Sequence, residues 1–292
     1  MIVCPIDNLQ LKKEDQLLSC PQCAYRAIKR RGNIYFHPDL DDTLINYNSK
    51  GLDILYKAEQ EHFWFKNRKK IILNAFLKYS SKDEDIIEIG AGTGSVARML
   101  MENGFKVAIG DIYSKGLEYA KTYGVDQRYQ FDLLSSPFEN HYDVIGMFDV
   151  LEHIEDEKLA LKNMHKMLKV EGKIILTVPA HMWLWNRADR IAHHQRRYER
   201  KEIVDLFNNN GFEVIKANNF FISILPLLYI RTILNKDDGS LPKFDEYEQE
   251  IKMNKIINTI LDITSSVENK VLERFNSNIG GSIILIAKKV MN

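Results

Sequence analysis

Between residues 84 and 217, short apolar segments alternate with amphipathic helical patterns, and this alternation restricts the possible folds most strongly. The strand-like segments include DIIEIG (85–90), KVAIGD (106–111), YDVIGMFD (142–149) and GKIILTVP (172–179). Helical patterns such as VARMLMEN (96–103) and EKLALKNMHKML (157–168) separate them. Such alternation favours parallel strands joined by crossover helices. We therefore expect an α/β fold with a doubly wound sheet, and SIILIAKK (282–289) returns to it as a last strand.

The character of the sequence changes four times along the chain, which suggests four regions. Residues 1–40 contain all three cysteines and short polar turns, and we expect a ribbon-like segment there. Apolar positions at helical spacing predict a helical cap over 41–83. The core covers 84–218 and 282–292, and amphipathic material at 219–281 interrupts it as an insertion.

Composition and charge exclude several classes of protein. The 292 residues are 45% hydrophobic and 27% charged, as in globular proteins. Forty basic residues balance forty acidic ones, which argues against a nucleic-acid partner. The first residues resemble no signal peptide, so we expect a cytoplasmic protein with reduced thiols. The longest uncharged apolar run, 220–230, is far shorter than the roughly 20 residues that span a bilayer.

The loop EIGAGTGS (88–95) contains a glycine at every second position after an apolar strand. Glycines at a strand-to-helix turn let the backbone approach a ligand closely, and the helix then offers its N-terminal amides. The dinucleotide fingerprint fits Gly92, Gly94 and Ala97, with Asp111 downstream to hold a ribose. A second register reads Glu88-x-Gly90-x-Gly92-x-Gly94. The glycines alone do not decide between these registers.

Three further motifs support the second register, which resembles motif I of the Rossmann-like methyltransferases that use S-adenosylmethionine. The motifs are HFWF with Arg68 (62–68), VLEHI (150–154), and the pattern from VPA (178–180) through LW (184–185), Asp189 and His194 to RRY (196–198). Together they are similar to bacterial and archaeal methyltransferases of the small-molecule type, over nearly the whole chain. The resemblance implies a seven-stranded doubly wound sheet with an antiparallel final strand, and methyl transfer from S-adenosylmethionine.

The same resemblance implies which residues bind the cofactor. Glu88 would lie near the amino group of the methionine part, Asp111 would accept both ribose hydroxyls, and Asp132 would accept from the adenine amine. A plain turn-capping role is the alternative for Asp132. The full expected set is Glu88, Gly90, Ala91, Gly92, Gly94, Asp111, Ile112, Asp132, Leu133, Phe148, Trp64 and Arg68.

Candidates for catalysis follow the fourth core strand and the fifth. A base assists methyl transfer when the acceptor is a hydroxyl, and Asp149, His153 and His194 are the candidates. Some quinone-type and RNA-type methyltransferases hold a divalent cation with a comparable set, here Asp149, Glu152 and His153. We favour the simpler interpretation, in which His153 packs near the cofactor and Glu152 caps or pairs.

The N-terminal region contains Cys4-Pro-Ile-Asp7 and Cys20-Pro-Gln-Cys23, which have the spacing of a zinc ribbon. Asp7 stands where a thiolate is usual. Zinc accepts carboxylate oxygen, so Cys4, Asp7, Cys20 and Cys23 form a chemically sound ligand set. A degenerate ribbon without metal is the alternative.

Two classes of acceptor follow from this sequence. The first is a small molecule methylated on oxygen or nitrogen: a sugar, a lipid-linked intermediate or a natural product. The second is RNA or protein, with the ribbon as a docking module. We expect the insertion to form part of the acceptor pocket, which implies an acceptor with an apolar portion or peripheral contact with a membrane surface.

Overall fold

The computed structural model describes residues 1–290 except 16, 39, 41–48, 241–245, 247–252 and 273. Its strands are β1 (Lys12–Glu14), β2 (Leu17–Ser19), β3 (Arg26–Arg30), β4 (Asn33–Tyr35), β5 (Ile86–Ile89), β6 (Val107–Asp111), β7 (Arg128–Gln130), β8 (Tyr142–Phe148), β9 (Leu168–Pro179), β10 (Phe212–Phe220) and β11 (Ser282–Lys289). They form one sheet in the order β1-β2-β3-β4-β7-β6-β5-β8-β9-β11-β10.

The predicted doubly wound sheet is confirmed in its seven core strands, from β7 to β10 in that order. Strands β7, β6, β5, β8 and β9 run parallel. Strand β11 lies between β9 and β10 and is antiparallel to both. All four residues of β5 are buried, as expected for a central parallel strand that is covered on both faces.

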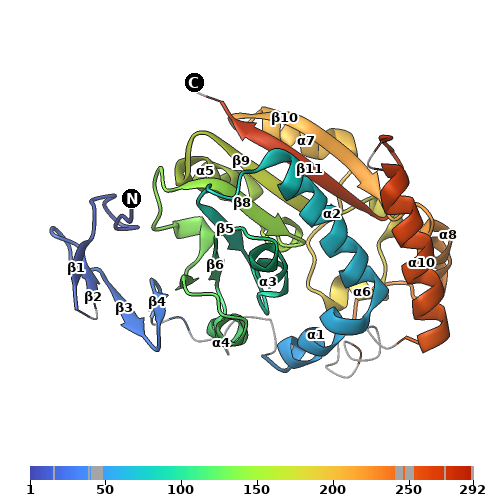
Figure 1. Ribbon diagram of the computed structural model, residues 1–292, viewed down its shortest axis with the longest axis horizontal. Coiled ribbons are helices and arrows are strands. Elements are labelled where there is room, and N and C mark those ends of the chain that lie inside the picture. The colour runs from blue at the N-terminus through green and yellow to red at the C-terminus, as the bar shows by residue number, and fades with distance from the viewer. Residues whose placement is uncertain are drawn as a thin grey trace.

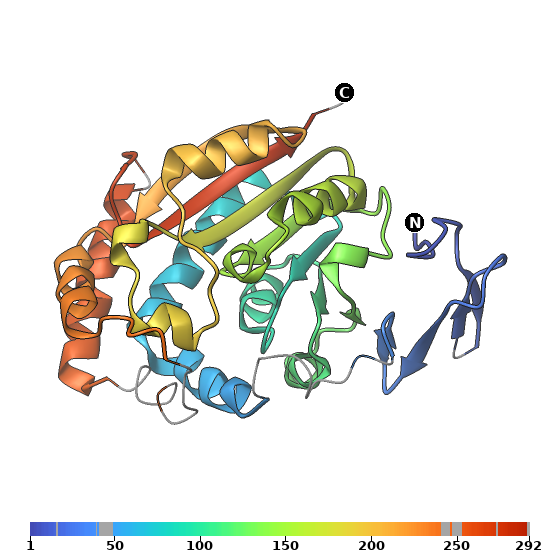
Figure 2. The ribbon, with the colours of Figure 1, turned by 180° about the vertical axis from the view of Figure 1, so that it is seen from behind.

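Helices cover both faces of the sheet (Figures 1 and 2). The helices are α1 (Ser49–Glu61), α2 (Phe63–Tyr79), α3 (Ser95–Glu102), α4 (Ser114–Thr122), α5 (Glu157–Met167), α6 (Arg187–Ile191), α7 (Arg200–Asn208), α8 (Leu225–Leu234) and α10 (Lys255–Leu272). Short 3-10 turns are η1 (Leu133–Ser135), η2 (Leu151–His153) and η3 (Met182–Leu184). Helices α2 and α3 lie on the face seen in Figure 1, and α5 and α7 lie on the face seen in Figure 2.

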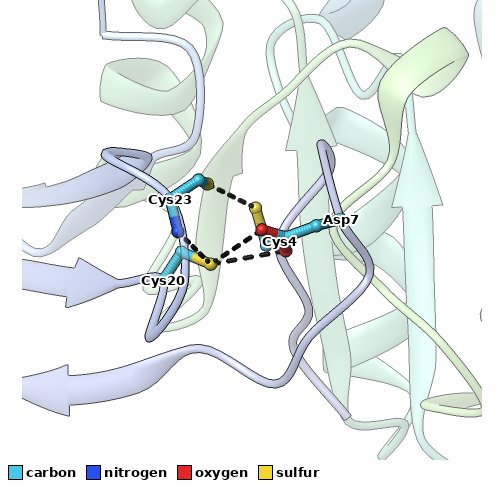
Figure 3. A group of neighbouring side chains, drawn as sticks. All are labelled: Cys4, Asp7, Cys20 and Cys23. Carbon is cyan, nitrogen blue, oxygen red and sulfur yellow. Dashed lines mark hydrogen bonds between the residues drawn. The ribbon is translucent and has the colours of Figure 1, made fainter.

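The N-terminal segment extends the sheet, so the sheet has eleven strands where the sequence predicted seven. Strands β1 to β4 form an antiparallel meander, and β4 then pairs in parallel with the core strand β7. The loop before β1 supplies Cys4 and Asp7, and the turn between β2 and β3 supplies Cys20 and Cys23 (Figure 3). The ribbon-like segment therefore docks on the edge of the core sheet.

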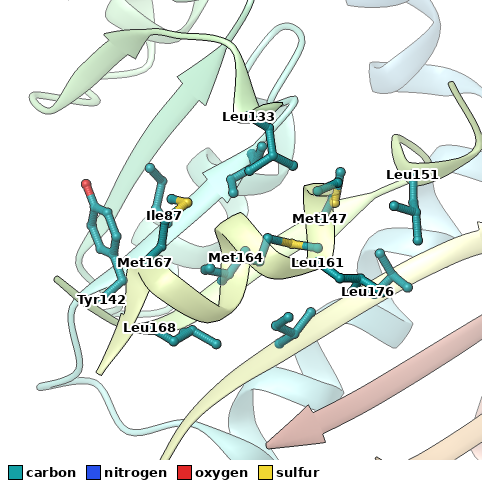
Figure 4. Close-up of a cluster of buried hydrophobic side chains, with 14 of the residues drawn as sticks. Ile87, Leu133, Tyr142, Met147, Leu151, Leu161, Met164, Met167, Leu168 and Leu176 are labelled. Carbon is teal, nitrogen blue, oxygen red and sulfur yellow. The ribbon is translucent and has the colours of Figure 1, made fainter. Parts of the chain in front are cut away.

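Buried aliphatic side chains fill the space between the sheet and its helices. On one face, Leu161, Met164 and Met167 of α5 pack in a cluster with Ile87 of β5 and Met147 of β8 (Figure 4). Helix α5 begins where the side chain of Asp156 accepts a hydrogen bond from the backbone N–H of Leu159. This cluster fixes the strands whose carboxyl ends form the cavity described below.

The two helices of the insertion pack on the core and on each other's segment. Helix α10 contributes Leu261 to the buried cluster that contains Phe220, Phe221 and Ile224 of the apolar run. It packs along α2 through polar side chains, including an ion pair between Asp262 and Lys66 and a 3.0 Å hydrogen bond from Ser266 to Asn67. Its isoleucines face away from α2. Residues 41–48 of the predicted cap, and 241–245 and 247–252 of the insertion, lie outside the described part of the chain.

No helix in the described part of the chain has the length and apolar content needed to cross a bilayer.

Candidate functional site

A cavity of about 550 Å³ lies where β5, β6, β7 and β8 end. In open α/β sheets, ligands bind at this carboxyl edge. The helices α1 and α2 also line the cavity. Its lining residues are Leu52, Leu55, Glu59, Trp64, Phe65, Arg68, Glu88, Ile89, Gly90, Ala91, Gly92, Val96, Asp111, Ile112, Tyr113, Phe131, Asp132, Leu133, Phe148, Asp149, Val150, His153, Ile154, Ala192, His193 and Gln195.

The glycine loop needs glycine for both conformation and space. Gly90 has φ +67°, and a Cβ at this position would lie 2.4 Å from a methyl carbon of Val150. The loop also depends on Gly116 of α4, where a Cβ would lie 2.2 Å from the carbonyl oxygen of Gly92. A side chain at position 116 would therefore push the loop out of place.

Asp111 fixes the loop from the end of β6. Its carboxylate accepts hydrogen bonds of 2.8 Å from the backbone N–H groups of Gly92 and Tyr113. These two bonds orient the carboxylate at the cavity wall.

Asp132 caps a turn, as in the alternative interpretation of the sequence, and it also faces the cavity. One carboxylate oxygen caps η1 by accepting a 2.8 Å hydrogen bond from the N–H of Leu134. The residue also lines the cavity, between Phe131 and Leu133. Its own N–H donates to Nδ1 of His37, which belongs to the N-terminal segment, at 3.3 Å.

Glu88 is a buried carboxyl in the cavity wall, and its Oε2 atom has no hydrogen-bond partner among the described residues. Burial raises the pKa of Glu88 to about 8; Glu59 and Asp111 add to this rise, and Arg68 opposes it. An unpartnered buried oxygen is costly, so this atom fits a cationic or hydrogen-bond-donating ligand.

Asp149 forms an ion pair with Arg68, which comes from α2. Thr177 also donates a 3.2 Å hydrogen bond to the Asp149 carboxylate. The Arg68 guanidinium lies 4.6 Å from the ring centre of Trp64, in cation–π geometry. The pairing suits Asp149 to hold Arg68 against the cavity wall more than to accept a proton from an acceptor.

The other catalytic candidates form a compact group with Glu152. The ring centres of His153 and His194 are 4.8 Å apart, and His194 Nε2 lies 3.9 Å from a carboxylate oxygen of Glu152. His194 Nδ1 is 2.9 Å from Asp189, which orients the ring. His153 lines the cavity, whereas His194 lies behind it. The ligand atoms that lie close together belong to Glu152, His153 and His194, whereas the less favoured cation set of the sequence analysis had Asp149 in place of His194.

Burial shifts the pKa values of Glu152 and His153 toward their uncharged forms. Burial raises the pKa of the Glu152 carboxyl well above its usual range, and the charge of Asp149 adds to the rise. Burial, with the neighbouring His194, lowers the pKa of His153 to about 3. The neutral imidazole in the cavity wall can accept a hydrogen bond, but its low pKa makes it a weak base at neutral pH.

All but two of the predicted cofactor-binding and catalytic residues line the cavity. The exceptions are Gly94, which has φ +77° in the glycine loop, and His194, whose ring contacts that of His153. The sequence analysis did not identify Leu55, Glu59, Tyr113, His193 or Gln195, which line the cavity too. Glu59 belongs to no motif. The only sequence signal for it is its spacing of four residues from Leu55, which places both side chains on one face of α1.

The comparisons with known proteins agree with this geometry. The model of the methyltransferase domain family matches residues 56–217, more than half of the chain. Among curated proteins, the ubiquinone biosynthesis O-methyltransferase of Rickettsia bellii is 28% identical over 100 residues, which cover 32% of this chain and 42% of the relative. The corresponding protein of Idiomarina loihiensis is 26% identical over 99 residues. The match thus spans less than half the length of these relatives.

Solved structures share the fold at lower identity. One is a complex between the Haloferax volcanii Trm112 methyltransferase activator and a putative methyltransferase: 15% identity, TM-score 0.55, covering 81% of this chain and 93% of that one. Another is Haemonchus contortus phosphoethanolamine N-methyltransferase 2 with S-adenosyl-L-methionine: 17% identity, TM-score 0.53, covering 84% and 58%. At these identities the likeness shows the fold alone.

Proposed function

We propose that this chain, which belongs to the methyltransferase domain family, transfers a methyl group from S-adenosylmethionine to an oxygen of a small acceptor with an apolar portion. The observation that carries this proposal is the cavity wall, where Glu88, Asp111 and Asp132 end or follow three neighbouring parallel strands. Three carboxyl groups so placed match the amine, diol and exocyclic amine of the cofactor.

The residues of the cavity fit S-adenosylmethionine. The Asp111 carboxylate lines the cavity and is oriented by two backbone N–H groups, and a carboxylate so placed can accept hydrogen bonds from ribose hydroxyls. The unpartnered Oε2 of Glu88 suits the ammonium of the methionine part. Phe131 and Leu133 offer apolar surface beside Asp132 for adenine. When bound, the cofactor supplies an electrophilic methyl group on a sulfonium.

We assign the acceptor to the part of the cavity that combines apolar side chains with the imidazole of His153. Phe65, Val150 and Ile154 line it and exclude water from an apolar acceptor. His153 is neutral at physiological pH, so its ring can accept a hydrogen bond from a hydroxyl acceptor and orient it, and the ring of His194 contacts that of His153. The curated relatives are named O-methyltransferases, which supports oxygen as the acceptor atom.

The alternative acceptor is RNA or protein, docked by the N-terminal segment. The zero net charge argues against RNA. Arg196 and Arg197 also form ion pairs within the protein: Arg196 with Glu157 at 2.7 Å, and Arg197 with Asp189 at 2.8 Å. A small acceptor therefore suits the described surface better.

Titration calorimetry with S-adenosylmethionine and with NADH tests the cofactor assignment. We expect measurable binding of S-adenosylmethionine and none of NADH, because the proposal assigns Asp111 to a ribose diol and Glu88 to an ammonium, and it assigns no group to a second nucleotide. The acceptor class is tested with radiolabelled methyl donor in a whole-cell extract. Label in the organic-solvent fraction supports the proposal, and label in RNA or protein overturns it.

A further inference from the structure

Four potential metal ligands converge in the N-terminal segment (Figure 3). The ligand atoms of Cys4, Asp7, Cys20 and Cys23 all lie within 4.8 Å of one another. Cys4 Sγ is 3.6 Å from Cys23 Sγ, and Cys20 Sγ is 3.3 Å from both carboxylate oxygens of Asp7. Ligands of tetrahedral zinc at the usual bond lengths are about 3.8 Å apart, close to these separations.

The backbone around the sulfur atoms is arranged to stabilise thiolates. The N–H of Ile6 approaches Cys4 Sγ at 3.4 Å, and those of Gln22 and Cys23 approach Cys20 Sγ at the same distance. N–H groups that point at sulfur favour its charged form, which is the form that binds metal. We propose that Cys4, Asp7, Cys20 and Cys23 bind one zinc ion, which fixes the N-terminal segment against the cofactor cavity.

The proposed fixing of the N-terminal segment against the cavity rests on a chain of hydrogen bonds that runs from this segment to the cavity. His37, just after β4, receives a 3.3 Å hydrogen bond from the N–H of Asp132 and is 2.7 Å from the hydroxyl of Ser135. Its own N–H donates to the side chain of Gln130 at 3.1 Å, and that side chain donates to the carbonyl of Ile112 at 3.2 Å. The ribbon thereby braces both loops that hold the carboxylates proposed for ribose and adenine.

Elemental analysis of protein purified without chelator tests the metal site. We expect about one zinc per chain, because four ligands make one tetrahedral site. The variants Cys20→Ser and Asp7→Asn should lose most of the zinc. Asp15→Asn, an exposed carboxylate on the same segment, is the matched control and should keep it. Reduced protein that takes up no zinc from an equimolar zinc solution would overturn the site.

The bracing role, which rests on the proposed function, has a separate readout. Removal of zinc, or His37→Ala, should weaken S-adenosylmethionine binding at least several-fold, while His165→Ala, a histidine on α5 outside the cavity, should not. Unchanged cofactor affinity in zinc-free protein would overturn the bracing and leave the metal site standing. If zinc-loaded protein fails to bind S-adenosylmethionine at all, the proposed function is wrong. The measured zinc content still tests the zinc site independently.

An independent observation concerns the outer surface of the insertion. Ile256, Ile260, Ile263, Val267 and Val271 follow one another at three- or four-residue spacing and form one stripe of α10. These side chains are 50–71% exposed, whereas the polar face of the helix is turned inward onto α2. Helices of soluble proteins normally bury the apolar stripe.

The neighbouring elements continue this apolar surface. Helix α8 lies beside α10 at the same end of the molecule in both views (Figures 1 and 2), and Glu268 of α10 accepts hydrogen bonds from the N–H groups that precede α8. At least half of Leu227, Tyr229 and Ile233 is exposed on α8. Trp183 of η3 is also exposed and contacts Tyr229 edge to face. Patches of this kind mark interaction sites.

The charges around the stripe indicate its partner. Lys255, Lys270 and Arg274 are exposed and pair with no carboxylate in the described part of the chain. The acidic groups of α10 are occupied instead: Asp262 by Lys66, and Glu268 by backbone amides. Aliphatic side chains flanked by unpaired cations and an exposed Trp–Tyr pair match the boundary of an anionic bilayer.

We infer that the outer face of α10 and α8 rests on an anionic lipid surface. The position suits the proposed acceptor, because α10 caps the start of α2, where Asn258 accepts a 2.8 Å hydrogen bond from the N–H of Phe63. The next residue, Trp64, lines the cavity and stacks on Phe221 of the insertion. An acceptor with an apolar portion could thus enter from the lipid.

Flotation with vesicles of phosphatidylcholine containing about one-fifth phosphatidylglycerol tests the lipid face. Val267→Asp should reduce the bound fraction several-fold, because it places a carboxylate in the apolar stripe. Val170→Asp is the control, since Val170 is 56% exposed on a distant strand and Val267 is 59% exposed. Equal flotation of both variants would overturn the inference. The inference would also be overturned if the wild-type protein did not bind vesicles but formed a dimer that Val267→Asp dissociates, because the face would then bind a second copy.

Discussion

Replacing Asp111 by alanine is expected to weaken S-adenosylmethionine binding by about 1–3 kcal/mol, or roughly 5- to 150-fold. The carboxylate supplies acceptors for the ribose diol and also holds the N–H groups of Gly92 and Tyr113. Asp111→Asn keeps the shape and one acceptor, so its loss should be smaller. Calorimetry with S-adenosylmethionine measures both variants.

The control for this experiment is Asp83→Ala, which removes an exposed carboxylate away from the cavity. Thermal melting of all variants shows whether the fold persists. A folded Asp111→Ala protein that binds the cofactor with wild-type affinity would refute the ribose assignment.

Glu88→Gln is expected to change how stability depends on pH. Burial raises the pKa of Glu88 from 4.5 to about 8, with help from the Glu59 and Asp111 charges and against Arg68. The folded state therefore holds a proton that the unfolded state loses. The stabilisation is complete below the unfolded pKa and is lost as pH rises toward the folded one. At one pKa unit per 1.36 kcal/mol, roughly 3–5 kcal/mol of unfolding free energy is at stake.

Glutamine keeps the neutral shape at every pH, so the variant should exceed the wild-type protein in stability near pH 8.5 and match it near pH 4.5. Urea unfolding at several pH values measures the difference. Glu84→Gln is the matched control with the opposite sign: partial burial acts to raise the pKa of Glu84, but hydrogen bonds from Ser80 and Ser81 lower it overall. Parallel pH profiles for wild type and Glu88→Gln would contradict the prediction.

The sequence predicted those candidate site residues that stand at the ends of successive core strands. Glu88, Asp111 and Asp132 each stand at or just after the end of an apolar strand, and parallel strands bring such positions to one edge. The periodic segments around them predicted the core strands and helices for the same reason. These local patterns needed no knowledge of distant contacts.

The remaining site features depend on contacts between distant segments. The Arg68–Asp149 ion pair joins residues 81 positions apart, and His37 reaches Asp132 across 95. No local sequence pattern marks Gly116 as the support of the glycine loop. Its role follows only from the structure, where a Cβ at this position would clash with the carbonyl oxygen of Gly92.

Helix α10 shows a different limit. Its helical period was predicted from the sequence, but the period alone does not show that polar side chains anchor the helix on α2. The polar anchor on α2, at Lys66 and Asn67, lies nearly 200 positions earlier in the chain.

The placement of β11 between β9 and β10 has a consequence for how the chain reaches its native state. Both neighbours precede β11 in sequence, and neither pairs with the other. During synthesis, β9 and β10 each have an unpaired hydrogen-bonding edge until the eight residues of β11 emerge from the ribosome. A chain interrupted before residue 282 would present two apolar strand edges at once, a template for aggregation rather than a slightly smaller enzyme.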